Sequence, residues 1–198
     1  MNSVLSTKYL LRTKYGILAA VLVLSVTARA DDLADRVVAR LASYPVVRAE
    51  FTQERTLASL TKPVISSGRL VFCREGLLWQ VEAPVKAVMV FNANGGSEGG
   101  AAQAEMARLI RALVAGDLRE LRQTFDVQPR GDLERWTLRL VPKARELAQY
   151  LRAIELAGGK HLELIGIAEA NGDSMTMRMR NFVVAPELDA GERRQFAQ

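Results

Sequence analysis

Short turns between successive strand-like segments are the feature of this sequence that most constrains its fold. After Pro45 the chain contains repeated segments of extended character, and in the first of them Val47, Ala49 and Phe51 alternate with polar neighbours. An apolar residue at every second position is typical of a β-strand with one buried face. Because the connections are too short for a crossover between parallel strands, the sequence predicts antiparallel hairpins.

Glycine, proline and asparagine residues mark the turns between these segments. Asn171-Gly172 is a strong hairpin signal, and residues 74–76 and 158–159 have the composition of tight turns. A further turn is expected over 129–132, and the segment 186–198 is expected to be a polar tail. Strands are expected over residues 47–52, 65–73, 77–82, 86–92, 125–128, 136–141, 151–156, 162–168 and 174–184.

Apolar residues at three- and four-residue spacing predict helices before and within this series of strands. Residues 31–44 carry one apolar stripe and end at a proline. Residues 101–114 show the same spacing after the glycine-rich segment 92–100, and a short helix is expected over 117–125. A long antiparallel sheet tends to curl, and inserted helices can cover its concave face. The sequence thus predicts an α+β protein with an apolar pocket, the usual form of a small-molecule or lipid site.

The first thirty residues have the pattern of a secretory signal peptide. Basic residues precede an uncharged, mostly apolar run over 16–26, and an A-x-A cleavage pattern ends at Ala30. The run is shorter than the roughly 20 residues that span a bilayer. We therefore expect cleavage near Ala30 and one mature domain, residues 31–198, exported to the periplasm. An uncleaved N-terminal anchor is the alternative.

The charge balance argues against a nucleic-acid partner. The formal net charge is +5, but four of the basic residues and none of the acidic ones lie in the first thirty residues. The mature chain is therefore close to neutral and lacks the excess of basic residues that binds the phosphates of nucleic acid. Arg130, Arg135 and Arg139 alternate with apolar residues and are expected to form a solvated strand face.

Nothing in the sequence indicates catalysis, a metal site or a cofactor. Cys73 is the only cysteine, so no intramolecular disulfide can form, and His161 is the only histidine, so no Cys/His zinc cluster is expected. His161 follows two glycines and a lysine and is expected to be exposed in a turn. No G-x-S-x-G element or Walker loop is present. We expect a protein that is not an enzyme.

The order of several short motifs resembles the periplasmic outer-membrane lipoprotein carriers, the LolA-like family. The pattern is A-x-F-x-Q from Ala49, G-x-x-x-F from Gly68, L-x-W ending at Trp79, and then Pro84. No single motif is diagnostic, but their order, spacing and combination with a signal peptide are specific. Further along the chain, residues 113–118 and 136–142 look like those of a divergent, LolA-related member.

This resemblance implies a fold and a function. The fold would be an unclosed antiparallel β-barrel with a helical lid over an apolar cavity. Such a carrier would bind the acyl chains of a lipid or lipoprotein in that cavity and act as the chaperone of this cargo. It would take the cargo from an inner-membrane exporter to an outer-membrane acceptor, as part of outer-membrane biogenesis. We expect a carrier of this kind to be a monomer.

The resemblance also gives Arg74 a candidate role. In the carriers an arginine after the G-x-x-x-F strand governs lid closure and ligand release, and Arg74 occupies the matching position. Glu75 stands where the carriers have proline. The carriers show a further pair of strands before the lid helix, where this chain has only the segment 92–100. This difference points to a shorter sheet and a more open cavity.

The candidate residues for contact with an acyl ligand are mostly apolar, and for them the alternative is ordinary core packing. For Arg74 the alternative is a solvated turn residue. Methionine suits a promiscuous lipid surface because its side chain adapts to many shapes. The lid candidates are Leu109, Ile110 and Leu113. The ligand-binding candidates are Leu70, Phe72, Arg74, Leu77, Trp79, Val88, Val90, Met175, Met177 and Met179.

Two other functions stay open on the sequence alone. A ligand-sensing or regulatory periplasmic module could use the same half-barrel fold, and it would need a stable protein partner. An enzyme that acts on acylated cargo is the least favoured, because no pair of nucleophile and base is recognisable.

Overall fold

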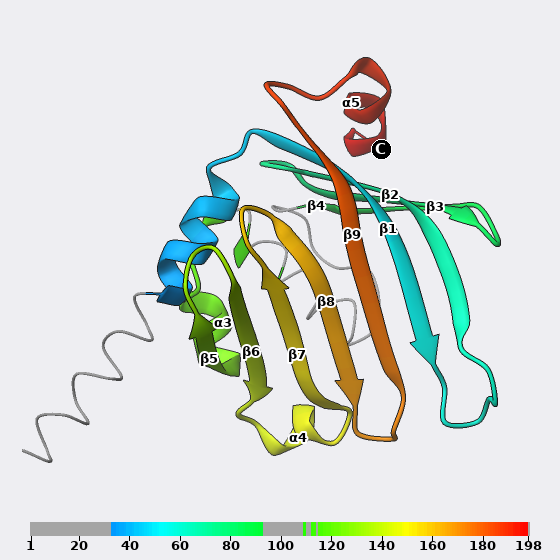
Figure 1. The fold of residues 1–198 in the computed structure, drawn as a ribbon, viewed down its shortest axis with the longest axis vertical. Helices are drawn as coiled ribbons and strands as arrows, with labels where there is room; N and C mark the ends of the chain where they lie inside the picture. The colour runs from blue at the N-terminus through cyan, green and yellow to red at the C-terminus, as the bar shows by residue number, and fades with distance from the viewer. Residues whose placement is uncertain (1–32, 93–108, 110–111, 114, 198) are drawn as a thin grey trace, which may run out of the picture.

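The computed structural model describes residues 33–92, 109, 112–113 and 115–197, which form one sheet with helices around it (Figure 1). The sheet has nine strands in the order β4-β3-β2-β1-β9-β8-β7-β6-β5. Neighbouring strands are antiparallel, as the short turns predict. The strands are β1 (Val46–Thr56), β2 (Val64–Cys73), β3 (Gly76–Ala83), β4 (Ala87–Asn92), β5 (Phe125–Gly131), β6 (Trp136–Pro142), β7 (Leu151–Gly158), β8 (Leu162–Glu169) and β9 (Ser174–Ala185).

The sheet is curled but not closed. β4 and β5 are its two edges, and the first strand, β1, pairs with the last strand, β9, in its middle. In Figure 1 the sheet bends round from β5 at the left through β9 and β1 to β4. The predicted fold class, an α+β protein built on an unclosed antiparallel β-barrel, is confirmed.

β5 is longer than the sequence predicts, because Pro129 does not end it. The sequence predicts a turn over 129–132, whereas the strand continues through the proline, which lies opposite Leu138. β5 is an edge strand, and edge strands tolerate a residue without a backbone N–H. The turn follows at Asp132, whose Oδ1 accepts hydrogen bonds from two backbone N–H groups at 2.9 and 3.0 Å.

Helices precede the sheet, interrupt it and follow it. The first, residues 33–42, ends before the proline as predicted, and its apolar stripe is buried at Val37 and Val38 and partly buried at Leu33 and Leu41. Of the predicted helix over 101–114, Leu109, Ala112 and Leu113 are helical and buried. Ile110 and most of the remainder lie outside the described residues. The other helices are α3 (Arg119–Thr124), α4 (Arg145–Ala148) and α5 (Ala190–Phe196).

The C-terminal segment forms a helix, α5, where the sequence predicts a polar tail. Asp189 caps it, because its side chain accepts hydrogen bonds from the N–H groups of Gly191 at 2.7 Å and Glu192 at 2.8 Å. The Glu192 carboxylate accepts one from the Asp189 N–H at 2.8 Å, which completes a capping box. The hydrogen bond from the Glu192 N–H, above all, lowers the pKa of the Asp189 carboxyl.

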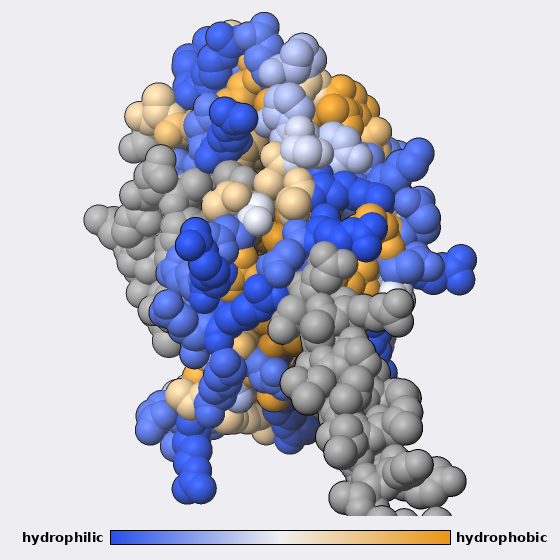
Figure 2. Space-filling view, turned by 90° about the vertical axis from the view of Figure 1, so that its left-hand side faces the viewer, coloured by the Kyte–Doolittle hydropathy of each residue, from blue (hydrophilic) through white to orange (hydrophobic). Residues whose placement is uncertain are grey.

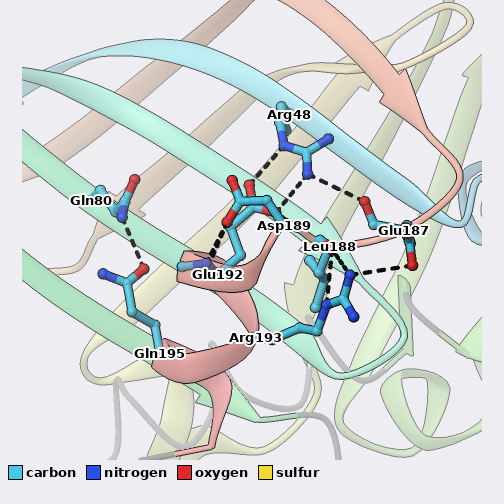
Figure 3. Close-up of polar contacts among 9 residues, drawn as sticks. Arg48, Gln80, Glu187, Leu188, Asp189, Glu192, Arg193 and Gln195 are labelled. Carbon is cyan, nitrogen blue, oxygen red and sulfur yellow. Dashed lines mark hydrogen bonds and ion pairs between the residues drawn. The ribbon is translucent and has the colours of Figure 1, made fainter.

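Polar contacts and a small hydrophobic cluster hold α5 against the outer face of the sheet (Figure 3). Arg48 of β1 donates two hydrogen bonds to the Glu192 carboxylate, the one from Nε at 2.7 Å, and these bonds raise the pKa of the guanidinium. Gln80 of β3 donates to Gln195 of α5 at 2.9 Å. The cluster consists of Val46, Val71, Cys73, Leu78 and Leu188.

Candidate functional site

The concave face of the sheet carries most of the residues that the sequence marks as ligand candidates. In the β2–β3 register Leu70 lies opposite Trp79, and in the β1–β9 register Phe51 lies opposite Met179. These side chains belong to one large hydrophobic cluster, which we call the interior. Their contact with a ligand stays a prediction. The candidates in the interior are Leu70, Phe72, Leu77, Trp79, Met175, Met177 and Met179.

Val88 and Val90 do not share this face. The β3–β4 register places Val88 opposite Gln80 and Val90 opposite Leu78, and both partners belong to the outer face under α5. The expectation that these two valines line the cavity with Trp79 is therefore wrong, because they lie on the opposite face of the sheet. Both faces of β4 are apolar in sequence, so the alternation could not show which one turns inward. Met89 and Phe91 hold the inward positions, and the rings of Phe91 and Trp79 lie 6.4 Å apart.

The described residues of the predicted lid lie against the interior. Leu109 is 1% exposed and Leu113 is 5% exposed, and both pack into the same cluster as the strand residues. The helix of residues 33–42 contributes Val37 and Val38 to this cluster. Helical residues thus cover part of the concave face in the described part of the chain, and the role of Leu109 and Leu113 in a lid stays a prediction.

A cavity of about 60 Å³, which we call the rim cavity, opens at one end of the interior. The end of the first helix, the β2–β3 turn, the β7–β8 turn and β9 surround it. Three residues that the sequence proposes, Phe72, Arg74 and Leu113, are part of its lining. The described residues that line it are Leu41, Ala42, Tyr44, Val47, Phe72, Cys73, Arg74, Leu113, His161, Leu162 and Phe182.

His161 is a member of this site that the sequence analysis missed. It is expected to be exposed in a turn, but its ring stacks on Phe182 with centroids 4.7 Å apart and lies 5.0 Å from the ring of Tyr44. Its Nδ1 atom is buried and has no hydrogen-bond partner in the described structure. Burial lowers the pKa of the imidazole. No local signal could have found this, because its ring partners are distant in sequence.

Arg74 lies in the β2–β3 turn, at the position that the resemblance assigns to the gating arginine. Its side chain is exposed and lines the rim cavity. Within the described part of the chain, no other residue forms a hydrogen bond or ion pair with its guanidinium. This cation, unpaired among the described residues, thus lies beside an otherwise mostly apolar lining. Its role in lid closure stays a prediction.

Two polar atoms of the strands are buried without a hydrogen-bond partner in the described structure. They are Oε1 of Gln53 and Nε1 of Trp79. Gln53 lies opposite Met177 in the β1–β9 register, and Trp79 packs edge-on against Phe51 with centroids 5.8 Å apart. An unsatisfied buried polar group costs about 1–3 kcal/mol. These atoms are therefore available for hydrogen bonds with a polar group that enters the interior.

The described residues hold no group of three or more histidine, cysteine or acidic side chains that could bind a metal ion. Cys73, the one thiol, is buried, and desolvation raises its pKa to about 12. It is therefore protonated at neutral pH, which suits an inert packing residue and not a nucleophile.

The side of the molecule that Figure 2 shows is mostly polar. Hydrophilic residues cover much of its described part, and hydrophobic residues are visible in smaller patches between them. Among the helices of the described residues, none has the length and apolar character needed to cross a membrane. The exposed Arg130 and Arg139 agree with the predicted solvated strand face, whereas Arg135 is exposed in the turn before β6.

Fold and site together define an open antiparallel half-barrel with an apolar interior, partly covered by helices and hollowed at one end. A model of the family described as outer membrane lipoprotein carrier protein LolA-like matches residues 25–179. This match covers most of the chain, so the protein belongs to that LolA-like family. Members of the family are periplasmic carrier or binding proteins, and membership supports a carrier-type role.

Solved structures with a related chain path are distant in sequence. A LolA superfamily protein from Nitrosomonas europaea is 8% identical, with a TM-score of 0.39 over 80% of this chain and 96% of its own. A domain assigned to outer membrane lipoprotein sorting from Vibrio parahaemolyticus is 8% identical, with a TM-score of 0.44 over 86% and 99%. A DUF1329 family protein from Desulfovibrio piger is 11% identical, with a TM-score of 0.32 over 80% and 92%. No curated protein matches the chain.

Proposed function

We propose that this protein is a non-enzymatic periplasmic carrier that binds the acyl chains of a lipid or lipoprotein in its interior. It would receive this cargo from an exporter in the inner membrane and deliver it to an acceptor in the outer membrane. The observation that carries the proposal is the concave apolar interior, which reaches the surface at the rim cavity. Membership of the LolA-like family supports it.

The energetics of acyl chains explain why such a carrier is needed. Each methylene that leaves water contributes about 0.8 kcal/mol, so a sixteen-carbon chain resists entry into water by roughly 12 kcal/mol. A carrier must offset most of this penalty and still release its load. A mostly apolar wall with few directional contacts meets both demands, and the interior has this character.

An acyl chain can enter only if interior side chains move. The rim cavity of about 60 Å³ is well below the roughly 300–1,000 Å³ of sites that enclose a drug-sized ligand. Met175, Met177 and Met179 form a buried row along β9, next to Gln53 and Phe51 of β1. Methionine repacks more easily than branched side chains, so this row is the part of the interior best able to give way.

The first test is native mass spectrometry and lipid extraction of the protein purified without detergent from its own periplasm. A discrete bound acyl species would support the proposal and would name the cargo class. A protein that carries no lipid and takes up no fluorescent fatty acid would contradict it. That outcome would favour the alternative, a ligand-sensing or regulatory periplasmic module on the same half-barrel.

A pair of variants tests the position of the site. Phe182→Glu places a charge in the rim cavity and should abolish uptake of a fluorescent fatty acid, because a buried carboxylate opposes an apolar ligand. Val183→Glu is the matched control, since this neighbour is 56% exposed and lies opposite Arg48 on the outer face. Circular dichroism would confirm that both variants fold. Equal uptake by both variants would show that the rim cavity is not part of the binding site.

A further inference from the structure

The rim cavity adjoins a second hollow of opposite character. This second hollow, the polar groove, has a volume of about 400 Å³ and lies between the β2–β3 turn, the connection into β1 and the segment before α5. Arg74, Glu75, Glu187 and Arg193 supply its charged side chains. Ala42 and Arg74 line both hollows, so the two meet at these residues.

The end of β9 and the segment after it form part of the wall of both hollows. Phe182 lines the rim cavity, and Glu187, Leu188 and Arg193 line the polar groove. All of these residues follow position 179, the last position that the family model matches. The pairing of an apolar hollow with a polar one therefore depends in part on residues beyond the matched range.

The two arginines of the polar groove differ in what they contact. Arg193 donates hydrogen bonds to the Glu187 carboxylate at 3.2 Å and to the Leu188 carbonyl at 2.7 Å (Figure 3). Arg74 has no such partner among the described residues. The guanidinium of Arg74, which is unpaired in the described part of the chain, therefore lies where the apolar lining of the rim cavity ends and the polar groove begins.

The acidic side chains of the groove limit where a bound anion can lie. Glu187 already has Arg193 as its partner at 3.2 Å. Glu75 lines the polar groove but not the rim cavity, so it repels an anion deeper in the groove. The place that best suits a negative charge is thus the junction at Arg74, directly next to the apolar hollow.

We propose that the ligand is an amphiphile whose hydrocarbon chain ends directly in an anionic oxygen head group, a carboxylate or a phosphate, and that Arg74 binds this head. The inference rests on the carrier function proposed above. The first carbons of the chain lie in the rim cavity against Phe72 and Phe182, and the head lies at the junction. Arginine matches planar carboxylate and phosphate oxygens with two parallel hydrogen bonds. A neutral ester or amide at the same place gains nothing from this cation.

The test is competition against a fluorescent fatty acid with three ligands of one chain length: dodecanoate, dodecyl phosphate and methyl dodecanoate. At neutral pH and low ionic strength, the anions should bind about fivefold tighter than the neutral ester, as an exposed ion pair allows. The tighter of the two anions identifies the head group. Arg74→Gln should abolish the preference, and Arg74→Lys should keep part of it. Glu75→Gln should strengthen binding of the anions alone.

Arg178→Gln is the control, because Arg178 is exposed on the outer face of β9 and is not among the described residues that line either hollow. It should leave all three affinities unchanged. Equal binding of anions and ester would overturn the inference while leaving the carrier function intact. Equal weakening of all three ligands in Arg74→Gln would also overturn it, in favour of a lid-closing role for Arg74. Failure of all three ligands and of the probe to bind would instead refute the carrier function.

Discussion

Gly68 shows how a single position is fixed by the close approach of two strands. A Cβ atom there would lie 1.9 Å from the backbone carbonyl oxygen of Gln80 in β3. The β2–β3 register shifts between Ser67 and Gly68, so the backbones approach at an irregularity of the ladder. The glycine of the G-x-x-x-F motif therefore has a structural reason in this chain, which is independent of ligand binding.

We expect Gly68→Ala to lower the free energy of unfolding by about 2–4 kcal/mol, because the backbone of β2 or β3 must shift to admit the methyl group. Urea unfolding at equilibrium measures this change. Gly166→Ala is the matched control in β8: its Cβ would meet no described atom closer than 3.6 Å, so its effect should be below about 1 kcal/mol. Similar losses in the two variants would show that the contact with Gln80 is not the cause.

At the scale of elements, a well-shielded ion pair contributes to the docking of α5 on the sheet. The side chain of Glu192 is 10% exposed and that of Arg48 is 28% exposed. Glu192→Gln keeps an amide oxygen for the capping box but removes the charge. We expect a loss of about 1–2 kcal/mol, measured as faster amide hydrogen exchange in residues 190–196 and a lower free energy of unfolding.

The control for this prediction is an exposed ion pair on the same sheet. Arg69 and Glu82 pair at 2.7 Å, with side chains 66% and 48% exposed. Glu82→Gln should cost less than about 1 kcal/mol, because surface pairs contribute little. If the two glutamine variants lost the same stability, the burial of the Arg48–Glu192 pair would not matter to the docking of α5.

The sequence predicts elements well where the signal is local. Residues 171–172 mark the β8–β9 hairpin, and the strands expected on either side of it are present. α5 was predictable in principle, since Asp189 and Glu192 form the D-x-x-E pattern of a capping box, but its seven residues lack an apolar stripe. Val88 and Val90 could not be assigned to a face, because β4 alternates one apolar residue with another.

At the scale of the whole molecule, the pairings between distant segments are what the sequence does not show. β1 pairs with β9 across most of the chain, and this pairing sets the open edges at β4 and β5. Turn residues report only which strands are consecutive. The same limit applies to the rim cavity, where Tyr44, His161 and Phe182 meet from three distant segments. The family motifs identified the interior, since they lie on β1, β2 and β3.

An interior that must open to admit a ligand links binding to the stability of the whole fold. A ligand that binds only the folded state should raise the free energy of unfolding by about 2.7 kcal/mol at a hundred times its dissociation constant. We expect dodecanoate to raise Tm with this concentration dependence and to shift the emission of Trp79, which packs on Phe51 in the interior.

The other tryptophan, Trp136, is fully buried and donates its N–H to the Gly159 carbonyl at 2.8 Å, so Trp136→Phe isolates the signal of Trp79. In the Phe182→Glu variant, dodecanoate should neither raise Tm nor shift the emission of Trp79. A rise in Tm that leaves Trp79 unchanged would mean that the ligand stabilises the fold from outside the interior.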